Sequence, residues 1–478
     1  QGAFQFAERV PWISAIRVNY FLAVDGLSLP LVLLTAVMMP VAAFASWGVA
    51  ERVRAHYALL LLLQAAMLGY FVALDFFFFF IFWEFSLVPA FLLIQLWGRE
   101  NRRDAALKFF IYTMAGSLGL LLLFQVFYQA TRAAGIPTFD IVELGRLGQG
   151  LPVGQEARTL QQIVFAWAQQ TGLANALGPF PLLYSSIAFW AIFVAFAIKL
   201  AVWPFHTWLP DAYSEAPTAA SILLAAVMSK MGAYGMLRIL LPLVPEAAQY
   251  FAPAMGALAL VGIVAGAFGA LSNVRGDLKR LIAYTSINHM GYVMLAIAAA
   301  AAAYSGATAD SRTIAINGAV MQMVAHGLST GALFLLAGFL AARTGGDTMR
   351  ELGGLRATMP GFAGAMGLAL FANLGLPGLA GFVGEFFIFR GAWATLPLFT
   401  LLATVGLVIT ALALLLMFQQ IFLGPIGRKW RNVADITPAE AGAVGPLLAL
   451  LVALGLFPAP IFNLANAAAT QLVNVFAK

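Results

Sequence analysis

A lysine lies inside an apolar run that is long enough to cross a membrane. Lys199 belongs to FWAIFVAFAIKLAVWPF, five residues before Pro204. An ammonium group at bilayer depth costs ~2.5–3.5 kcal/mol on insertion scales unless protein or water solvates it. Pro204 has no N–H, and its ring collides with the carbonyl four residues earlier, at Leu200. Membrane proteins tolerate a broken helix only where protein or a water-filled cavity covers it, so this stretch indicates part of an ion path.

Two further charged residues lie near the middle of apolar runs. Glu84 is flanked by phenylalanine and tryptophan in DFFFFFIFWEFSLVPAFLL, and Lys230 is central in ILLAAVMSKMGAYGML. Burial disfavours the charged form of each side chain, whereas a neighbouring opposite charge favours it. Each could therefore act as a proton switch. The alternatives are a structural hydrogen bond between helices for Glu84 and a fixed salt bridge for Lys230.

Two histidines and a second glutamate have similar surroundings. A lone histidine on an apolar face is more often structural, but His289 and His326 both have polar neighbours; Gln322, four residues before His326, falls on the same helix face. Glu385 follows Pro377 by eight residues, and its alternative role is a contact that stabilises a broken helix. The complete set predicts a relay that passes protons along a hydrated file: Glu84, Lys199, Lys230, His289, His326 and Glu385.

Four other titratable residues are given smaller roles. His206, just past Pro204, is expected near the exit of the broken helix, and His56 is expected to be a solvated residue of a basic loop. Asp75 is expected at the outer interface. Lys108 is expected to reach the cytoplasmic surface from the start of a span.

The composition restricts the class of protein. The chain is 62% hydrophobic and 10% charged, whereas soluble domains carry roughly 25% charged residues, so most of it must face lipid or other apolar helices. The absence of cysteine excludes disulfides, iron–sulfur ligation and thiolate zinc sites in these 478 residues. Four histidines without local partners argue against a metal site. The net charge of +6 reflects basic loops and does not indicate nucleic acid.

Apolar runs of about 20 residues, the length that spans ~30 Å of hydrocarbon, recur throughout the chain. They predict an all-α polytopic membrane protein with twelve spans and no competing strand pattern, and the tenth span is interrupted around Pro377. The predicted spans are 27–48, 56–74, 76–97, 105–128, 182–204, 216–241, 250–273, 280–302, 314–342, 360–393, 398–423 and 443–466.

Basic residues in the loops predict the orientation. The loops after the first, third, seventh, ninth and eleventh spans carry clusters of arginine and lysine, among them Arg275, Lys279 and Arg280, and the positive-inside rule places these odd-numbered loops in the cytoplasm. Both ends then lie outside, as does the long connection 129–181. We expect an extracytoplasmic segment over 1–26, a helical bundle over 27–466 and a tail over 467–478. The polar start lacks the features of a signal peptide and indicates the continuation of a longer chain.

The two interrupted spans suggest an internal symmetry. The fifth and tenth predicted spans are each broken at a proline, and each carries one buried ionisable residue, Lys199 or Glu385. Interrupted spans at matching positions of two halves are typical of inverted repeats in transporters.

Several long segments resemble one protein family. FWEFSLVPAFLLIQLWG, KFFIYT, AIKLAVWPFHTWLPDAYSEAPTAAS, DLKRLIAYTSINHMGYVML, MVAHGLSTGALFLLAG and GLPGLAGFVGEF are similar to the antiporter-like subunits of respiratory complex I, the NADH–quinone oxidoreductase. The resemblance covers nearly the whole chain. It is greatest to the M type, which has glutamate in the broken tenth span, as at Glu385; the L and N types and the Mrp antiporter subunits usually have lysine there.

The resemblance implies a fold and a function. It implies fourteen helices in the family, with two five-helix inverted repeats at about 56–241 and 250–423 and broken helices at Pro204 and Pro377. It implies proton translocation through the six relay residues named above, coupled to quinone reduction in partner subunits, among them L-type and N-type subunits, in the bacterial inner membrane. No cofactor is expected in this chain, since flavin, iron–sulfur clusters and quinone belong to partner subunits. The alternatives are a cation/proton antiporter subunit of Mrp type and a purely structural membrane scaffold.

Overall fold

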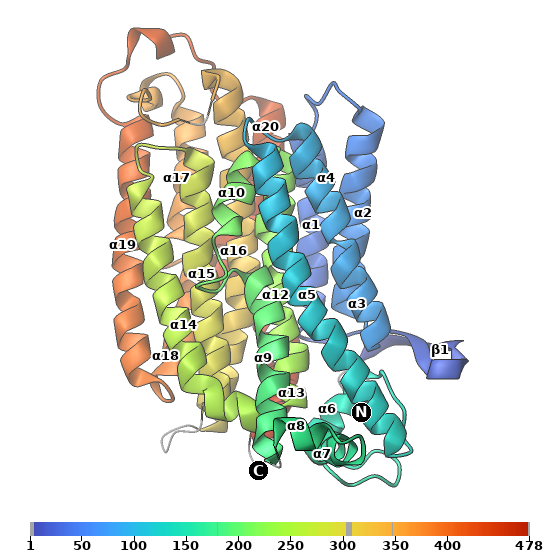
Figure 1. Ribbon diagram of the computed structural model, residues 1–478. Coiled ribbons are helices and arrows are strands. Elements are labelled where there is room, and N and C mark those ends of the chain that lie inside the picture. Colours follow the sequence, from blue (N-terminus) through green and yellow to red (C-terminus); the bar gives the residue numbers. More distant parts are fainter. Residues whose placement is uncertain (1–3, 179, 303–307, 347, 477–478) are drawn as a thin grey trace.

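The computed structural model describes residues 4–178, 180–302, 308–346 and 348–476, and most of this chain is helical (Figure 1). The α-helices are α1 (Leu29–Ala45), α2 (Val53–Val72), α3 (Phe76–Phe85), α4 (Leu87–Trp97), α5 (Arg102–Ala133), α6 (Ile141–Gly148), α7 (Leu160–Gln170), α8 (Leu173–Leu177), α9 (Pro181–Leu200), α10 (Trp208–Glu215), α11 (Thr218–Leu223), α12 (Ser229–Gly235), α13 (Leu241–Leu243), α14 (Pro245–Ser272), α15 (Leu278–Ala301), α16 (Ala309–Thr344), α17 (Pro360–Asn373), α18 (Ala380–Trp393), α19 (Pro397–Phe422), α20 (Pro438–Leu456) and α21 (Ala459–Val473).

Within the described residues, ten helical segments are long and apolar enough to cross a membrane, so the chain is a multi-pass membrane protein. These ten correspond to ten of the twelve predicted spans. The other two predicted spans correspond to α1, a shorter apolar helix, and to the pair α17 and α18, two short helices that are not among the ten. The helical fold class is therefore confirmed.

The expectation that no strand occurs was wrong for the first residues. β1 (Gln5–Ile13) and β2 (Val18–Val24) form an antiparallel hairpin. A two-stranded hairpin is marginal alone in water. Here it is held by the start of α3, because Trp12 and Tyr20 pack on Phe78 with ring centroids 4.8 and 5.4 Å away. No local pattern in the sequence predicted the hairpin, because the residue that holds it, Phe78, lies outside the two strands.

In the described residues, three breaks at proline or glycine interrupt predicted spans, in addition to the single-residue step at Ser86 between α3 and α4. Helix α9 ends at Leu200, where the ring of Pro204 would collide with the helical carbonyl, and Ala201 takes the left-handed conformation before α10 begins. Between α17 and α18, Gly375 and Gly378 also have positive φ angles. Both breaks were predicted. The third break was missed: Pro458 separates α20 from α21, inside the predicted span 443–466.

Three spans form the interior of the bundle. The segments Thr218–Leu243, Leu278–Ala301 and Ala309–Thr344 are 89–100% buried over their most apolar windows, whereas the other seven are 22–56% buried. The first of them contains two π-helical turns, Leu224–Met228 and Met236–Leu240, on either side of α12. Lys230, His289 and His326 lie on these three spans, one on each, and so are shielded from lipid on all sides.

The chain ends and the basic loops occupy opposite faces of the bundle. Both ends of the chain lie at the face that carries α6, α7 and α8, in the lower part of Figure 1. The connections α1–α2, α4–α5, α14–α15, α16–α17 and α19–α20 lie at the opposite face. This common face is the one predicted from the arginine and lysine clusters, and its assignment to the cytoplasm stays a prediction.

Candidate proton-relay site

Lys199 is buried at the end of α9, beside the junction between α3 and α4. Its Nζ donates a hydrogen bond to Oγ of Ser86 (3.1 Å) and lies 4.7 Å from the centroid of the Trp83 ring. A cation over an aromatic face is attracted to the ring, more strongly when both are desolvated. Ser86 and Trp83 therefore solvate the ammonium group in place of water.

Glu84 lies on the same helix as Trp83 but forms no direct ion pair with Lys199 in the described part of the chain. The side chain is partly exposed, and its Oε1 is buried without a hydrogen-bond partner. The hydroxyl of Ser117, on α5, accepts the indole N–H of Trp83 (2.9 Å) and donates to the Thr113 carbonyl (2.9 Å). In the described part of the chain, Lys199 is therefore hydrogen-bonded to Ser86 and not to Glu84.

Lys230 is in direct contact with His326. The Lys230 Nζ lies 2.7 Å from Nδ1 of His326 and also donates to the Ala225 carbonyl and to Oγ of Ser229 (3.2 Å). Because the ammonium group can only donate, Nδ1 is the acceptor, and the hydrogen of a neutral His326 ring is on Nε2. That nitrogen is buried and has no protein partner among the described residues.

His289 lies between His326 and Glu385. Its ring centroid is 5.2 Å from that of His326, and its Nδ1 is 3.1 Å from Oε1 of Glu385. The order in space is therefore Lys230, His326, His289 and Glu385. The sequence analysis included His289 in the relay but did not give its place in the series, because residue spacing does not reveal which of two buried histidines faces α18.

Two amide side chains complete this end of the site. Gln322 Nε2 lies 3.3 Å from Nδ1 of His289 and 3.4 Å from Oε1 of Glu385. Asn373, the last residue of α17, presents Oδ1 to Nε2 of His289 (3.0 Å). The sequence analysis noted Gln322 for its position on the helix face of His326. It missed Asn373, for which the only signal was its place immediately before the predicted break.

The helix break makes room for the Glu385 carboxylate. A Cβ atom added to Gly375 would lie 2.4 Å from Oε2 of Glu385. Gly375 also has a φ of +80°, a conformation that favours glycine. The residue type at 375 is thus required both by the backbone and by the neighbouring carboxylate.

Two expectations about peripheral residues were wrong. His56 is not solvated; it is buried in the first turns of α2, with Nε2 2.8 Å from Oγ of Ser46 and its ring 4.8 Å from that of Trp97. The helix begins at Val53, earlier than predicted, which turns His56 inward. Lys279, counted among the loop cations, is also buried, because it lies within α15 and donates to the Ala216 carbonyl (3.0 Å).

The other three residues given smaller roles are Lys108, His206 and Asp75. Lys108 is half exposed and pairs with Asp211 of α10 (2.7 Å), which also binds Arg280 (2.8 Å). His206 lies between α9 and α10, outside both helices. Asp75 is buried as the N-terminal cap of α3, where it accepts the backbone N–H groups of Phe77 and Asn19.

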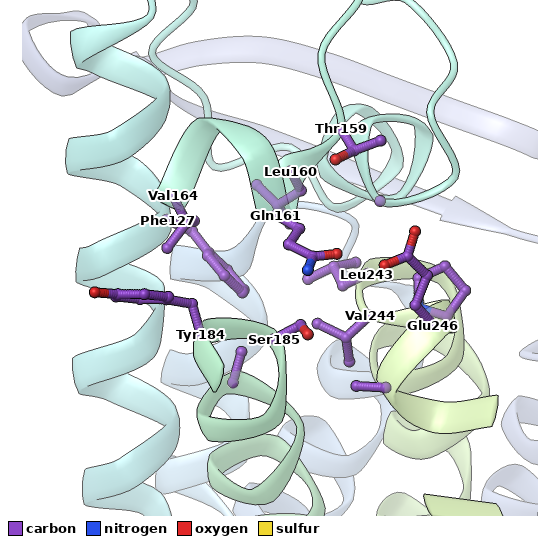
Figure 2. Close-up of a pocket in the computed structure, with 14 residues that line it drawn as sticks. Phe127, Thr159, Leu160, Gln161, Val164, Tyr184, Ser185, Leu243, Val244 and Glu246 are labelled. Atoms are coloured by element: carbon purple, nitrogen blue, oxygen red, sulfur yellow. The ribbon is translucent and has the colours of Figure 1, made fainter. Parts of the chain in front are cut away.

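Two cavities lie near the face with the chain ends, away from the relay. One of about 20 Å³ is bordered by Gln161, Tyr184, Val244 and Glu246 (Figure 2). The other, about 430 Å³, borders the ion pair of Asp25 and Arg238. Neither contains a relay residue. In the described part of the chain, no group of three or more histidine, aspartate or glutamate side chains is placed to hold a metal ion.

Comparison with known proteins identifies similar chains. Residues 73–410 match the family model described as "NADH:quinone oxidoreductase/Mrp antiporter, TM". The chain is 39% identical to "F(420)H(2) dehydrogenase subunit M" of Methanosarcina mazei, over 97% of this chain and 86% of the relative. It is 37% identical to NADH-quinone oxidoreductase subunit M of Pseudomonas aeruginosa, over 96% of this chain and 83% of the relative.

Two solved structures share the fold. A chain of respiratory complex I from Thermus thermophilus superposes with a TM-score of 0.82 at 28% identity, covering 99% of this chain and 90% of that one. A chain of the Mrp complex from Dietzia superposes with a TM-score of 0.76 at 21% identity, covering 100% and 89%. The second likeness concerns the fold alone.

Proposed function

The chain belongs to the NADH:quinone oxidoreductase/Mrp antiporter transmembrane family, and on this premise we propose that it is the proton-translocating membrane subunit of a quinone-reducing respiratory complex. The observation that carries the proposal is the buried series Lys230, His326, His289 and Glu385. Protonatable side chains inside a membrane are costly and are typical of proton relays. Four of them in succession on neighbouring central helices are better explained by proton transfer than by packing.

The first half of the relay is a switch formed by Glu84 and Lys199. While Glu84 is ionised and close, its charge favours the ammonium form of Lys199. When Glu84 is neutralised or drawn towards a neighbouring subunit, Ser86 and Trp83 alone solvate that charge. Lys199 then gives its proton to Lys230 through water.

The second half conducts the proton away from Lys230. The proton passes from the Lys230 ammonium to Nδ1 of His326 and reaches the His289–Glu385 pair, from which it leaves to the outside. No group in this series needs to be oxidised or reduced. The electron-transfer chemistry, with its flavin, iron–sulfur clusters and quinone, belongs to partner subunits.

Relatives suggest the setting of the complex. Similar chains are subunits of NADH-quinone oxidoreductase and of F(420)H(2) dehydrogenase, so the electron donor differs within the family. We propose other membrane subunits of L and N type as neighbours, and the bacterial inner membrane as the location. The second candidate function is a cation/proton antiporter subunit, which the family description favours because it names the Mrp antiporter beside NADH:quinone oxidoreductase.

The test is proton translocation by the purified complex in vesicles with a pH-sensitive dye. Replacing Lys230 by alanine should abolish quinone-coupled pumping, and Lys429→Ala, at an exposed lysine, should not. Glu84→Gln should reduce pumping far more than Glu84→Asp, since only aspartate retains the charge. Normal pumping by an assembled Lys230→Ala complex would contradict the proposal. Sodium transport without any quinone reduction would favour the antiporter function.

A further inference from the structure

Both nitrogens of the His289 ring face oxygen atoms. Nε2 lies 3.0 Å from Oδ1 of Asn373, and Nδ1 lies 3.1 Å from Oε1 of Glu385. The orientation of the amide follows from its other end, because Nδ2 of Asn373 donates to the hydroxyls of Ser329 (3.2 Å) and Thr330 (3.4 Å). The amide oxygen is therefore the atom directed at the histidine.

This geometry determines how many exchangeable protons His289 and Glu385 share. An amide oxygen can only accept, so Nε2 of His289 carries a hydrogen at all times. The contact between Nδ1 and Glu385 then needs one more proton, which lies either on the ring or on the carboxyl group. The pair is an imidazolium with a carboxylate, or an imidazole with a carboxylic acid; in both forms it holds a single exchangeable proton.

Gln322 is placed for the state in which that proton has left. Nδ1 and Oε1 would then face each other with lone pairs only. The Gln322 amide nitrogen lies 3.3 Å from the first and 3.4 Å from the second, so it can donate to either. Its own Oε1 has no partner among the described residues, and a Cβ atom at Gly384 would lie 2.4 Å from it. The side chain is thus held by close packing with the amide nitrogen towards the pair.

We propose that Asn373 and Gln322 are positioning residues that make His289 and Glu385 a one-proton site. Asn373 blocks proton exchange at Nε2 and favours the loaded state, whereas Gln322 favours the empty state. The role of this site in pumping rests on the proposed function, but its proton count depends only on the geometry. The other explanation is that the two amides merely join α17 to α15 and α16.

The two explanations differ in what they predict for His289. Hydrogen–deuterium exchange at the imidazole C2 position, followed by mass spectrometry of the whole complex between pH 5.5 and 9, reports the ratio of imidazolium to imidazole at one histidine. In Asn373→Ala this ratio for His289 at pH 7 should fall about tenfold, the effect of losing one hydrogen bond from a charged donor. In Gln322→Met, which keeps the volume but loses the amide donor, the ratio should rise.

Matched variants make the result decisive. Asn373→Asp keeps an acceptor oxygen and should hold His289 as imidazolium across the range. Asn317→Ala removes another buried amide of α16, bonded to Asn466 (2.8 Å), and should leave His289 unchanged. If Asn373→Ala fails to assemble, Gln322→Met and Asn373→Asp still test the direction in which the imidazolium-to-imidazole ratio of His289 shifts.

Each outcome has one meaning. Opposite shifts in Asn373→Ala and Gln322→Met support the one-proton site; shifts in the same direction, or none, overturn it. The proposed function is tested separately. If the imidazolium-to-imidazole ratio of His289 shifts as expected while Lys230→Ala pumps normally, the one-proton site is supported and the proposed proton translocation is contradicted. If Lys230→Ala stops pumping while the ratio of His289 is the same in the Asn373 and Gln322 variants, the proposed function is supported and the positioning role is contradicted.

Discussion

A hydroxyl and an aromatic face hold the Lys199 ammonium group, and among the described residues no carboxylate bonds to it. Such neutral partners solvate a cation without fixing it, because neither carries a charge that must be separated when the proton leaves. Glu84, which lies on α3 next to Trp83, can then shift the equilibrium between the charged and neutral forms of Lys199 by its charge alone. Side-chain identity made Lys199 a candidate from the sequence, but its partners depend on how α3, α5 and α9 pack.

The Ser86 hydroxyl should therefore matter for pumping. In Ser86→Ala the charged Lys199 loses a hydrogen bond, and such bonds contribute about 1.5–3 kcal/mol. Proton pumping in vesicles should fall about tenfold. Ser86→Thr, which keeps the hydroxyl, should retain most of the activity; equal pumping by the alanine and threonine variants would exclude this role.

At the scale of elements, the helix breaks were easier to predict than the hairpin. Proline acts on its own helix, so Pro204 and Pro377 were visible in the sequence, and Pro458 could have been. The strands β1 and β2 depend on aromatic side chains far along the chain, which no local pattern reveals. The position of Asn373 at the end of α17 likewise depends on the turn that follows it.

The glycine at the second break gives an element-scale prediction. Gly375→Ala should displace the Glu385 carboxylate, because the new Cβ atom would lie 2.4 Å from Oε2. Pumping should be lost while quinone reduction continues. The matched control is Gly378→Ala, where φ is also positive (+91°) but no atom lies within 4 Å of the added Cβ. If the two variants behave alike, backbone strain and not the carboxylate explains the loss.

The stability of the hairpin formed by β1 and β2, at the face that carries the chain ends, should depend on pH. Burial raises the pKa of Asp75 to about 6, with a contribution from Asp140; burial and Glu143 raise that of Asp140 to about 6. Asp140 also pairs with Arg9 of β1 (2.9 Å). A raised pKa means that folding favours the protonated form, so this contribution to stability is full below pH ~3.8 and is lost as the pH rises through about 6.

Amide hydrogen exchange can measure this effect. Protection of residues 18–24, corrected for the intrinsic exchange rate, should fall tenfold or more between pH 5 and pH 8. The control lies at the opposite face, around Asp435. Burial raises the pKa of Asp435, but hydrogen bonds from the backbone N–H groups of Phe362 and Gly361 outweigh this and lower the pKa. The contribution of Asp435 to stability is therefore constant between pH 5 and pH 8. Protection of the hairpin that is unchanged or greater at pH 8 would be incompatible with the two raised pKa values.

At the scale of the whole molecule, composition and periodicity predicted the membrane class and the number of crossings. The pairing of charged residues could not be predicted, because it depends on the three interior spans. Lys230, His326 and His289 are far apart in sequence and meet only because the span Thr218–Leu243 packs together with α15 and α16. The ion pair of Asp25 and Arg238 was missed for the same reason.

The central claim is that Lys230, His326, His289 and Glu385 conduct protons as one unit. The most direct test compares pumping by His326→Gln, Glu385→Gln and the double variant in vesicles, with quinone reduction as a control for assembly. Residues that act as a unit show non-additive losses. We expect the double variant to pump no worse than the poorer single variant. Losses that multiply in the double variant would show that the two residues act independently and would contradict a single connected relay.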